Sequence, residues 1–396
     1  RSLNAIHINH GLQPEALDWE SQCQALCHEL GVSFQDHRLH LDPDRPDLEA
    51  RARRARYDVF EETLEAGDTL FMAHHGDDQA ETVLLRLLRG SGVRGLAGMP
   101  ASRKLGAGHL HRPLLALSRA RIDALARHWG FSWCEDHSNH NTRFDRNYIR
   151  HHVMPALTER WPEAVPRFNR SAAHCREADE LLSELAGQDA EAVSADRGVS
   201  VQRLAELPDS RCQQLMRYLI RLNGLQPPGE SRLATGINAL VNAPQDGAPE
   251  LRGDGYCIRR YRDRLWVVPD MREPVPARIQ HWHPDESLEW FGTTLESRLG
   301  LGQGIGRSWA DGLVVTVREG GERIEPRPDQ PQRALKKWLQ EQVVPPWERQ
   351  RLPLIWYGNR LVAVADLWIA PDFRADPEEP GWQPVWHRPW WLMRSQ

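Results

Sequence analysis

Short apolar runs alternate with longer amphipathic stretches over the first third of the chain. The runs have the length and composition of buried strands, and the stretches repeat their apolar residues every three or four positions, as helices do. The expected strands cover residues 3–8, 32–37 and 69–73. The expected helices cover residues 18–30, 48–64, 78–88 and 120–128, the last capped by Ser118 or a neighbour. This alternation predicts a parallel sheet covered on both faces, with ligands at the carboxyl ends of its strands.

The pattern changes after Trp161 and Pro162. Residues 170–243 have mostly helical periodicity, and residues 256–268 alternate as strands do. Residues 269–309 are rich in Pro, Gly and His, so we expect a connector with little regular structure there.

The C-terminal part of the chain combines strands with one helix. The expected elements are strands at 313–317, 354–358 and 361–369 and a helix at 334–342. The tail from Ala375 is crowded with Pro and Trp and is expected to be peripheral. We therefore predict an α/β protein with a Rossmann-like parallel-sheet domain at residues 1–165, a mainly helical middle domain at 166–270, a connector at 271–310 and a small α+β domain at 311–396.

Composition narrows the class of protein. The 396 residues are 40% hydrophobic and 27% charged, which is typical of a globular chain of two or three domains. No apolar run is long enough to span a bilayer, and residues 1–30 do not resemble a signal peptide. The six cysteines are scattered without a CxxC pair, which argues against a zinc site or a disulfide scaffold and favours a reducing cytoplasm.

The charge pattern leaves two interpretations open. The net charge of −5 excludes a generally basic nucleic-acid binder, so any such contact must come from local patches. The only lysines are Lys104, Lys336 and Lys337, and all the other cations are arginine. This excess reflects either a GC-rich genome or the suitability of the planar guanidinium for phosphate contacts.

The chain starts with Arg1 rather than Met, and its first expected strand begins at residue 3. Because a domain rarely opens in the middle of a sheet, we expect further sequence upstream.

The segment AHHGDDQAET, residues 73–82, places titratable groups at a strand-to-helix turn. Asp78 and Glu81 are three residues apart and share a helix face, beside Asp77 and the pair His74 and His75. Carboxylates there can hold Mg²⁺ or accept a proton from an attacking amine. The alternative is a capping box, since carboxylates at a helix start stabilise it without any catalytic role.

A second polar segment, EDHSNHNTRFDRNYIR at residues 135–150, has almost no hydrophobic periodicity. Its Asx residues are compatible with turns and caps. Alternatively, Arg146, Asn147 and Arg150 contact phosphates or an RNA backbone. The glycine-rich loop at residues 89–100 permits close approach of backbone to a nucleotide, but a flexible loop explains it equally well.

Two basic helices are further candidates. The helix EARARRARY, residues 49–57, carries Arg51 and Arg54, which either form a solvated face or meet a nucleotide or RNA. In the helix near residue 338, an apolar stripe directs Lys336 and Lys337 toward solvent, where they either form a solvated face or contact RNA.

Together and in chain order, these segments resemble the tRNA(Ile)-lysidine synthetase family of the PP-loop ATP pyrophosphatase superfamily. The matching segments are HINHGL (7–12), EARARRARY, the stretch 73–99, RPLL (112–115), EDHSN with FDRNYIR, and the closing GGERI, LKKWLQE, VPPW and PLIWYG. The resemblance covers nearly the whole chain and implies a PP-loop, or HUP-type, fold for residues 1–165, with a tRNA-binding C-terminal domain.

The resemblance also implies a reaction. In this family ATP adenylates the C2 carbonyl oxygen of the wobble cytidine in the CAU anticodon of isoleucine tRNA. The amine of L-lysine then attacks C2, which gives lysidine, AMP and diphosphate. Departure of diphosphate implies Mg²⁺ as well as ATP.

Site residues follow from the same match. Asp78 and Glu81, with Asp77 beside them, are the catalytic candidates, and Asp78 is also the candidate Mg²⁺ ligand. The nucleotide side is expected at His10, Gly11, His74 and His75. Contacts to tRNA or phosphate are expected from Arg51, Arg54, Arg146, Asn147, Arg150, Lys336 and Lys337.

One family feature is lacking. The SGGxDS loop, which cradles pyrophosphate, does not occur in the 396 residues. We therefore expect the N-terminal PP-loop segment to be missing and the chain as given to bind ATP poorly. Rival interpretations are a PP-loop tRNA-thiolation enzyme, a non-catalytic tRNA-binding fragment, and a metal hydrolase built on His74, His75 and Asp77. The oligomeric state is open, with a homodimer as one option.

Overall fold

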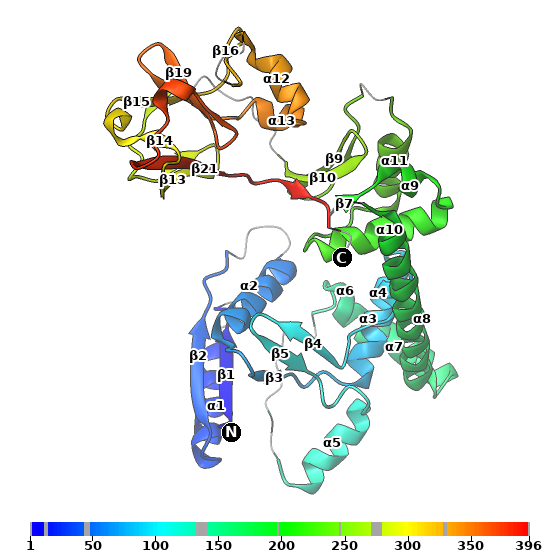
Figure 1. Cartoon of the computed structure of the whole chain (residues 1–396). Coiled ribbons are helices and arrows are strands. Elements are labelled where there is room, and N and C mark those ends of the chain that lie inside the picture. The colour runs from blue at the N-terminus through cyan, green and yellow to red at the C-terminus, as the bar shows by residue number, and fades with distance from the viewer. Residues whose placement is uncertain are drawn as a thin grey trace. The chain divides into compact units, whose positions relative to one another are not determined.

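The computed structural model describes most of the chain, and its contacts divide into two compact units, residues 1–182 and 183–396 (Figure 1). The described residues are 2–11, 15–42, 48–131, 133, 141–195, 198–244, 247–270, 279–327 and 331–394. The EDHSN part of the motif at 135–150 therefore lies outside the described residues. The expected boundary at residue 165 falls just inside the long helix α8.

The first unit combines two small sheets with helices. Its elements are β1 (Asn4–Asn9), α1 (Ala16–Glu29), β2 (Ser33–Arg38), α2 (Leu48–Thr63), β3 (Thr69–Phe71), α3 (Gly76–Leu88), α4 (Val93–Leu96), β4 (Ser102–Leu105), β5 (Gly108–His111), α5 (Arg119–His128), α6 (Asp145–Tyr148), the π-helix η2 (Ile149–Val153), α7 (Met154–Arg160) and α8 (Ala164–Val193). Strand β1 runs parallel to β2, and β3 runs parallel to β5, which pairs antiparallel with β4. The predicted α/β architecture is confirmed.

Both sheets contribute to one apolar cluster. Phe60 of α2 and Leu64, which follows this helix, pack with Leu105 and Leu110, and side chains of β1 and β3 lie against them. Every strand and helix expected in the first 128 residues is present within two residues of its predicted bounds, because each has a clear period of 2 or 3.6. Ser118 caps α5, as expected, by accepting a hydrogen bond from the N–H of Arg121.

Helix α3 is anchored mainly through its first half. Ala80 and Val83 are buried, whereas Leu87 and Leu88 of the expected apolar stripe are exposed. A side chain at Gly76, the first residue of α3, would meet the carbonyl oxygen of Leu117 at 3.0 Å. The N-terminus of α3 therefore sits against the loop that precedes α5, which fixes the carboxylates of its first turns.

The second unit begins with helices and ends with strands. Its elements are β6 (Ser194–Ala195), β7 (Gly198–Val199), α9 (Val201–Ala205), α10 (Asp209–Leu222), α11 (Glu230–Asn242), β8 (Glu250–Arg252), β9 (Tyr256–Tyr261), β10 (Arg264–Pro269), β11 (Ile279–His281), β12 (Leu288–Trp290), β13 (Thr293–Leu301), β14 (Ile305–Gly306), η3 (Arg307–Trp309), β15 (Leu313–Thr316), β16 (Arg323–Ile324), β17 (Arg333–Ala334), α12 (Leu335–Glu341), α13 (Pro346–Arg349), β18 (Leu354–Tyr357), β19 (Arg360–Val364), β20 (Trp368–Ile369), η4 (Pro371–Phe373), β21 (Pro380–His387) and β22 (Trp391–Leu392). The helical periodicity of residues 170–243 and the strands at 256–268 are confirmed.

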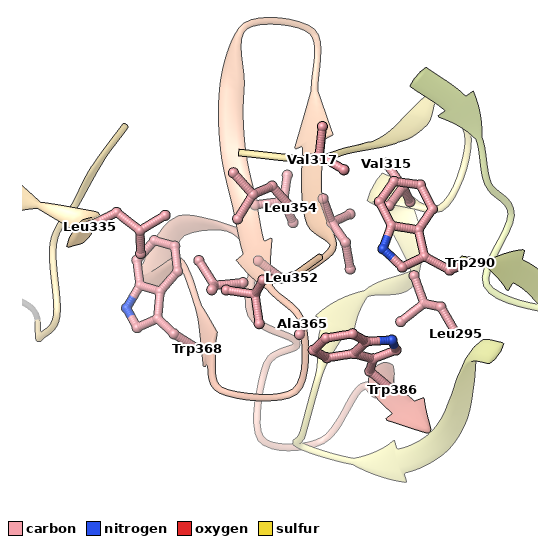
Figure 2. Close-up of a cluster of buried hydrophobic side chains, with 14 of the residues drawn as sticks. Trp290, Leu295, Val315, Val317, Leu335, Leu352, Leu354, Ala365, Trp368 and Trp386 are labelled. Atoms are coloured by element: carbon pink, nitrogen blue, oxygen red, sulfur yellow. The ribbon is translucent and has the colours of Figure 1, made fainter. Parts of the chain in front are cut away.

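Two predictions for the second unit are wrong. Of the expected connector, residues 279–309 contain β11 to β14 and carry the fully buried Trp290. The tail is not peripheral either, because β21 pairs along its whole length with β13 and buries Trp382 and Trp386. Figure 2 shows Trp386 in the cluster of buried side chains. Burial of aromatic surface stabilises these segments, although Pro and Gly obscured their alternation.

Among the described residues, no helix combines the length and apolar character needed to cross a bilayer.

Candidate active site

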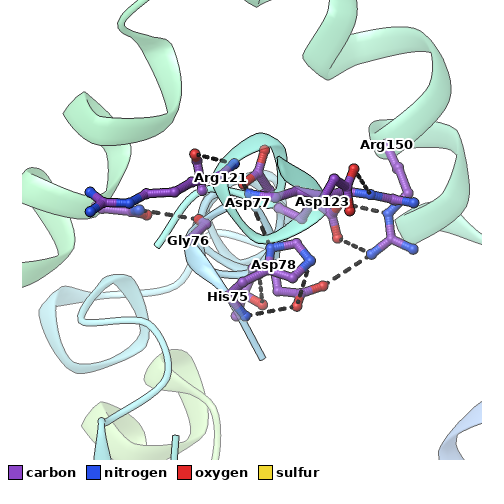
Figure 3. Close-up of polar contacts among 12 residues, drawn as sticks. His75, Gly76, Asp77, Asp78, Arg121, Asp123 and Arg150 are labelled. Carbon is purple, nitrogen blue, oxygen red and sulfur yellow. Dashed lines mark hydrogen bonds and ion pairs between the residues drawn. The ribbon is translucent and has the colours of Figure 1, made fainter. Parts of the chain in front are cut away.

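The N-terminus of α3 places the acidic motif directly after β3. His75 is the N-cap residue, and its backbone N–H donates to Oδ2 of Asp78 at 3.0 Å (Figure 3). Asp78 therefore does cap the helix, with His75 rather than Glu81 as its partner in the motif. Capping and a second role are compatible, because Oδ1 of Asp78 faces other groups.

Those groups are two arginines, and we call Asp78, Glu81, Arg146 and Arg150 the arginine–carboxylate cluster. Arg146 donates from Nη2 to Oδ1 of Asp78 at 3.0 Å and from Nε to Oε2 of Glu81 at 2.9 Å. Arg150 donates from Nε to Oε1 of Glu81 at 2.7 Å and from Nη2 to Oδ1 of Asp78 at 3.0 Å. Two guanidiniums thus balance two carboxylates, and the side chain of Glu81 is only 3% exposed.

The electrostatics of the cluster favour the charged form of Arg150. Burial by itself lowers the pKa of Arg150, but its hydrogen bond and charge pairing with Glu81, together with Asp78, raise that pKa overall. Charge-assisted bonds of this kind are roughly twice as strong as neutral ones. The cluster therefore fastens α6 and η2 to α3 across a sequence separation of more than 60 residues.

Arg150 lies in the π-helix η2, and Arg146 lies one turn earlier in α6. A spacing of four residues puts both guanidiniums on one face. Asn147 is half-buried, and its side-chain amide donates to the carbonyl oxygen of Asn141 at 3.0 Å. The expected contacts of Arg146 and Arg150 with phosphate or RNA stay predictions, and in the structure both side chains bond to carboxylates.

Asp77 ties α3 to α5. Its Oδ2 accepts the backbone N–H of Arg119, the first residue of α5, at 2.7 Å. A hydrogen bond from His75 is the main cause that lowers the pKa of Asp77, and the Arg119 N–H adds to it. Asp77 is the most exposed of the three candidate carboxylates, with 32% of its side chain open to solvent.

Four basic side chains near the cluster each have one buried nitrogen without a hydrogen-bond partner, and we call Arg56, Arg112, His74 and His10 the basic pocket. Within the described part of the chain, the Nε atoms of both arginines and the Nδ1 atoms of both histidines are buried without a hydrogen-bond partner. Buried donors almost always have partners, so four such atoms together call for a ligand. Phosphate oxygens are acceptors that suit guanidinium groups.

The pKa shifts link the basic pocket to the acidic motif. Burial is the main cause that lowers the pKa of His74, to about 4, with Asp78 opposing it and Arg112, Arg146 and Arg53 lowering it further. Burial and then Arg56 lower the pKa of His10. Burial is the larger cause of both shifts, and the neighbouring arginines lower both pKa values further, an effect that a bound anion would offset.

Helix α2 supplies this charge through residues that sequence reasoning missed. Arg51 donates to the carbonyl oxygen of Asp42, and Arg54 is exposed. The inward residue is Arg56, which is half-buried, whereas Arg53 is exposed and its guanidinium lies 4.9 Å from the Tyr57 ring centroid. The sequence contains a pattern that predicts this arrangement. Arg53, Arg56, Tyr57 and the buried Phe60 follow the i, i+3, i+4, i+7 spacing of one helix face.

The remaining predicted residues lie where the sequence placed them. His10 and Gly11 follow the end of β1, and the N–H of Gly11 donates to Oδ1 of Asn9 at 2.9 Å in a left-handed turn with φ of +66°. Lys336 and Lys337 are exposed on α12. The apolar stripe beneath them is confirmed, because Leu335, Trp338 and Leu339 are buried.

The acidic motif fits a bound Mg²⁺ poorly. Both oxygens of Asp78 and both oxygens of Glu81 already accept hydrogen bonds from His75 or the two arginines. Among the described residues, no three His, Cys, Asp or Glu side chains converge as a metal site. The sequence-based assignment of Asp78 as a Mg²⁺ ligand is not supported by this geometry and stays a prediction.

Comparison with known protein families divides the chain into three matched segments. A model described as a PP-loop domain matches residues 1–157, a TilS substrate binding domain matches residues 200–266, and a TilS substrate C-terminal domain matches residues 313–386. The expectation that the PP-loop part is missing is wrong for the domain, which is present although the sequence contains no SGGxDS motif.

Relatives match over most of the chain. The tRNA(Ile)-lysidine synthase of Coxiella burnetii is 40% identical over 385 residues, which cover 96% of this chain and 86% of that protein. The tRNA(Ile)-lysidine synthase of Alkalilimnicola ehrlichii is 42% identical over 379 residues, which cover 95% and 85%. The solved U34-tRNA thiolase NcsA of Methanococcus maripaludis covers 44% of this chain and 63% of its own at 17% identity and a TM-score of 0.36, a likeness that supports no conclusion.

Proposed function

The chain belongs to the tRNA(Ile)-lysidine synthase family, and we propose that it joins L-lysine to C2 of the wobble cytidine of isoleucine tRNA with a CAU anticodon. It is a ligase that uses ATP through its PP-loop domain. The products are lysidine, AMP and diphosphate. The observation that carries this proposal is the pairing of a basic pocket with an acidic helix start at one end of α3, in a chain whose relatives bear this activity.

We assign the phosphates of ATP to the basic pocket. Arg56 and Arg112 offer buried Nε–H groups, and the His74 imidazole is neutral near pH 7 because burial lowers its pKa to about 4. Hydrogen-bond donors that are already fixed in a partly desolvated site do not have to reorient during the reaction. They therefore stabilise the negative charge that develops on the departing diphosphate. His10 and Gly11 at the end of β1, with His75, complete the nucleotide side.

Asp78 and Glu81 have different tasks in this proposal. The Asp78 side chain is 12% exposed and that of Glu81 is 3% exposed, so Asp78 is the carboxylate that a bound amine reaches. We propose that Asp78, with Asp77 beside it, accepts a hydrogen bond or proton from the attacking lysine amine. Glu81 is a positioning residue that holds Arg146 and Arg150, which in turn fix Asp78.

Contacts with the tRNA belong to both units. Arg51, Arg54 and Asn147 of the first unit and Lys336 and Lys337 of the second remain the candidates for phosphate contact, because they are solvent-accessible and polar. The matched segments described as substrate domains support an RNA-binding role for the second unit.

We place the reaction in the cytoplasm. Mg²⁺ stays a predicted cofactor with no assigned ligand, and a homodimer stays a prediction.

The rival functions have weaker support. A tRNA-thiolation enzyme is not what the relatives that match over most of the chain are, since they are tRNA(Ile)-lysidine synthases, and burial raises the pKa of both Cys212 and Cys257 to about 11, which makes these two thiols poor nucleophiles at neutral pH. A non-catalytic fragment does not explain why the catalytic candidates and their supporting arginines are all retained in one cluster.

The proposed function is tested by incubating the full-length protein with isoleucine tRNA, ATP and L-lysine and analysing the digested nucleosides by mass spectrometry. We expect lysidine and AMP, both dependent on lysine and on the CAU anticodon. Release of AMP with a sulfur donor and formation of a thiolated nucleoside would identify the thiolation enzyme instead.

A further inference from the structure

The glycine-rich loop at residues 89–100 is held in place by side chains from two helices. Nη1 of Arg86, on α3, donates to the carbonyl oxygen of Gly98 at 2.9 Å. Nη2 of Arg176, on α8, donates to the carbonyl oxygen of Met99 at 3.2 Å. Gly98 and Met99 are themselves buried. The end of this loop is therefore a fixed part of the first unit, and the flexible loop that the sequence also allowed does not form there.

Gln79 of α3 binds the same part of the loop through both ends of its side-chain amide. Its Nε2 donates to the carbonyl oxygen of Met99 at 3.0 Å, and its Oε1 accepts the backbone N–H of Met99 at 2.7 Å. We call these two bonds the Gln79–Met99 joint. Gln79 is only 4% exposed, so the joint is shielded from water. A side chain at Gly98, where φ is +67°, would come within 2.6 Å of Oε1 of Gln79, so the close approach that this glycine permits is to the joint.

The Gln79–Met99 joint fixes the rotation of α3 about its own axis. Gln79 directly follows Asp78, and successive side chains of an α-helix are about 100° apart around the axis. Because Arg176 of α8 holds the loop independently of α3, the joint prevents α3 from turning. It thereby sets the direction in which the Asp78 carboxylate points.

The basic pocket is anchored on the same loop. Nη1 of Arg112 donates to the carbonyl oxygen of Pro100 at 2.7 Å, and Pro100 directly follows Met99. The charges of Asp78 and Arg112 both act on His74, as expected for groups that lie near one another. Two adjacent loop residues therefore hold both the acidic start of α3 and one guanidinium of the basic pocket.

We propose that Gln79 is a positioning residue for the lysine-transfer step, which holds Asp78 in a fixed place and direction relative to a nucleotide bound at the basic pocket. This inference rests on the proposed function, because it assigns Asp78 to the attacking amine. Gln79 itself touches no substrate in this proposal. Its effect is large because a displacement of about 1 Å in a reacting geometry costs about 100-fold in rate.

The test compares two partial reactions in Gln79→Met, which keeps the length of the side chain but removes both bonds of the joint. Arg86 still connects α3 to the loop, so we expect a folded protein. Exchange of labelled diphosphate into ATP, with isoleucine tRNA but no lysine, should stay close to that of the wild type. Transfer of lysine in a single turnover should be about 10- to 100-fold slower. The matched control Gln24→Met, on the exposed helix α1, should change neither reaction.

A double-mutant cycle distinguishes positioning from general damage to the fold. If Gln79 acts through Asp78, the double variant with Gln79→Met and Asp78→Asn transfers lysine no more slowly than Asp78→Asn alone. Independent damage would instead multiply the two losses. Gly98→Ala disturbs the joint from the loop side, so it should slow transfer and retain exchange as Gln79→Met does.

Three results would overturn the proposal: lysine transfer at the wild-type rate in Gln79→Met, equal losses of exchange and transfer, or multiplied losses in the double variant. Thermal unfolding shows whether each variant is folded. If Gln79→Met does not fold, Gln79→Glu, which keeps an acceptor for the N–H of Met99, is measured in its place with the same outcomes. A wild type that forms no lysidine would refute the proposed function itself, whereas the three results above leave that function standing.

Discussion

Asp78→Asn separates the two roles that Asp78 has in the structure. The asparagine oxygen can still accept the His75 N–H, since Asn is as good as Asp near a helix start. What is lost is the negative charge that faces Arg146 and Arg150 at 3.0 Å each. The asparagine amide then presents its own donors to two guanidiniums, so the arginine–carboxylate cluster keeps its geometry but not its charge balance.

The magnitude follows from burial. Removing one partner of a fully buried ion pair costs about 3–5 kcal/mol. The two arginine side chains are 25% and 22% exposed and Glu81 still pairs with both, so we expect about 1–3 kcal/mol for Asp78→Asn. Asp78→Ala also loses the cap and should cost about 1 kcal/mol more.

Two assays read the variant. Urea unfolding gives the free energy, and lysidine formation at saturating substrates gives kcat. We expect a folded protein whose kcat is at least about 100-fold lower, the usual loss when an acid–base group is removed. Asp58→Asn, on the exposed face of α2, is the control and should change neither quantity. Turnover of Asp78→Asn close to that of the wild type, with the expected loss of stability, would show that Asp78 only caps and braces α3.

Further predictions concern the basic pocket and the core. Arg56→Gln should raise the KM for ATP about 10- to 100-fold, which is the equivalent of one charge-assisted hydrogen bond of about 1.5–3 kcal/mol. The exposed Arg127→Gln is the control and should leave the KM unchanged. An unchanged KM in Arg56→Gln would show that Arg56 is not on the nucleotide side. The pKa of His74 is about 4 in the folded state and lies below its unfolded value, so the unfolded state binds the proton first and the stability of the protein should fall as pH drops from about 6.5 to about 4. Allowing for solvent screening, His74→Gln should remove about 1–2 kcal/mol of that pH dependence in chemical unfolding. An identical pH profile in the variant would contradict the assignment. Trp290→Ala should destabilise the second unit by about 3–5 kcal/mol in thermal or urea unfolding, because Trp290 is fully buried and its Nε1 donates to the carbonyl oxygen of Arg351 at 2.7 Å; a loss below about 1 kcal/mol would show that the segment is peripheral after all.

Local periodicity predicted seven elements of the first 128 residues well, because each of them has a single clear pattern, but it missed α4, β4 and β5, which are only four residues long each. It failed for β21, in which Trp382 and Trp386 alternate inward around Pro384. Proline normally argues against a strand, because it has no backbone N–H to donate to a neighbouring strand. Pro384 is tolerated in β21 because β14 pairs only with Gly381 and Trp382, so Pro384 lies outside that pairing. The partner strand β13 is about 90 residues earlier, and no local signal reports such a pairing.

The candidate site, like the fold, was predicted from the sequence only in part. The residue types and spacing of the acidic motif identified Asp78 and Glu81, but nothing in the sequence says that Arg146 and Arg150 neutralise them across 65 or more residues. Nor did composition distinguish the inward Arg56 from the outward Arg54, although the helical phase of Phe60 does so in retrospect. Charge is visible in a sequence, whereas burial and pairing depend on tertiary contacts.

The central claim is that the basic pocket holds a nucleotide while the arginine–carboxylate cluster serves the attacking amine. Exchange of labelled diphosphate into ATP, measured with the full-length protein and isoleucine tRNA but no lysine, tests it most directly. We predict that Arg56→Gln diminishes this exchange, whereas Asp78→Asn retains it and fails only when lysine must react. Loss of exchange in Asp78→Asn with retention in Arg56→Gln would contradict the division of labour between the two groups.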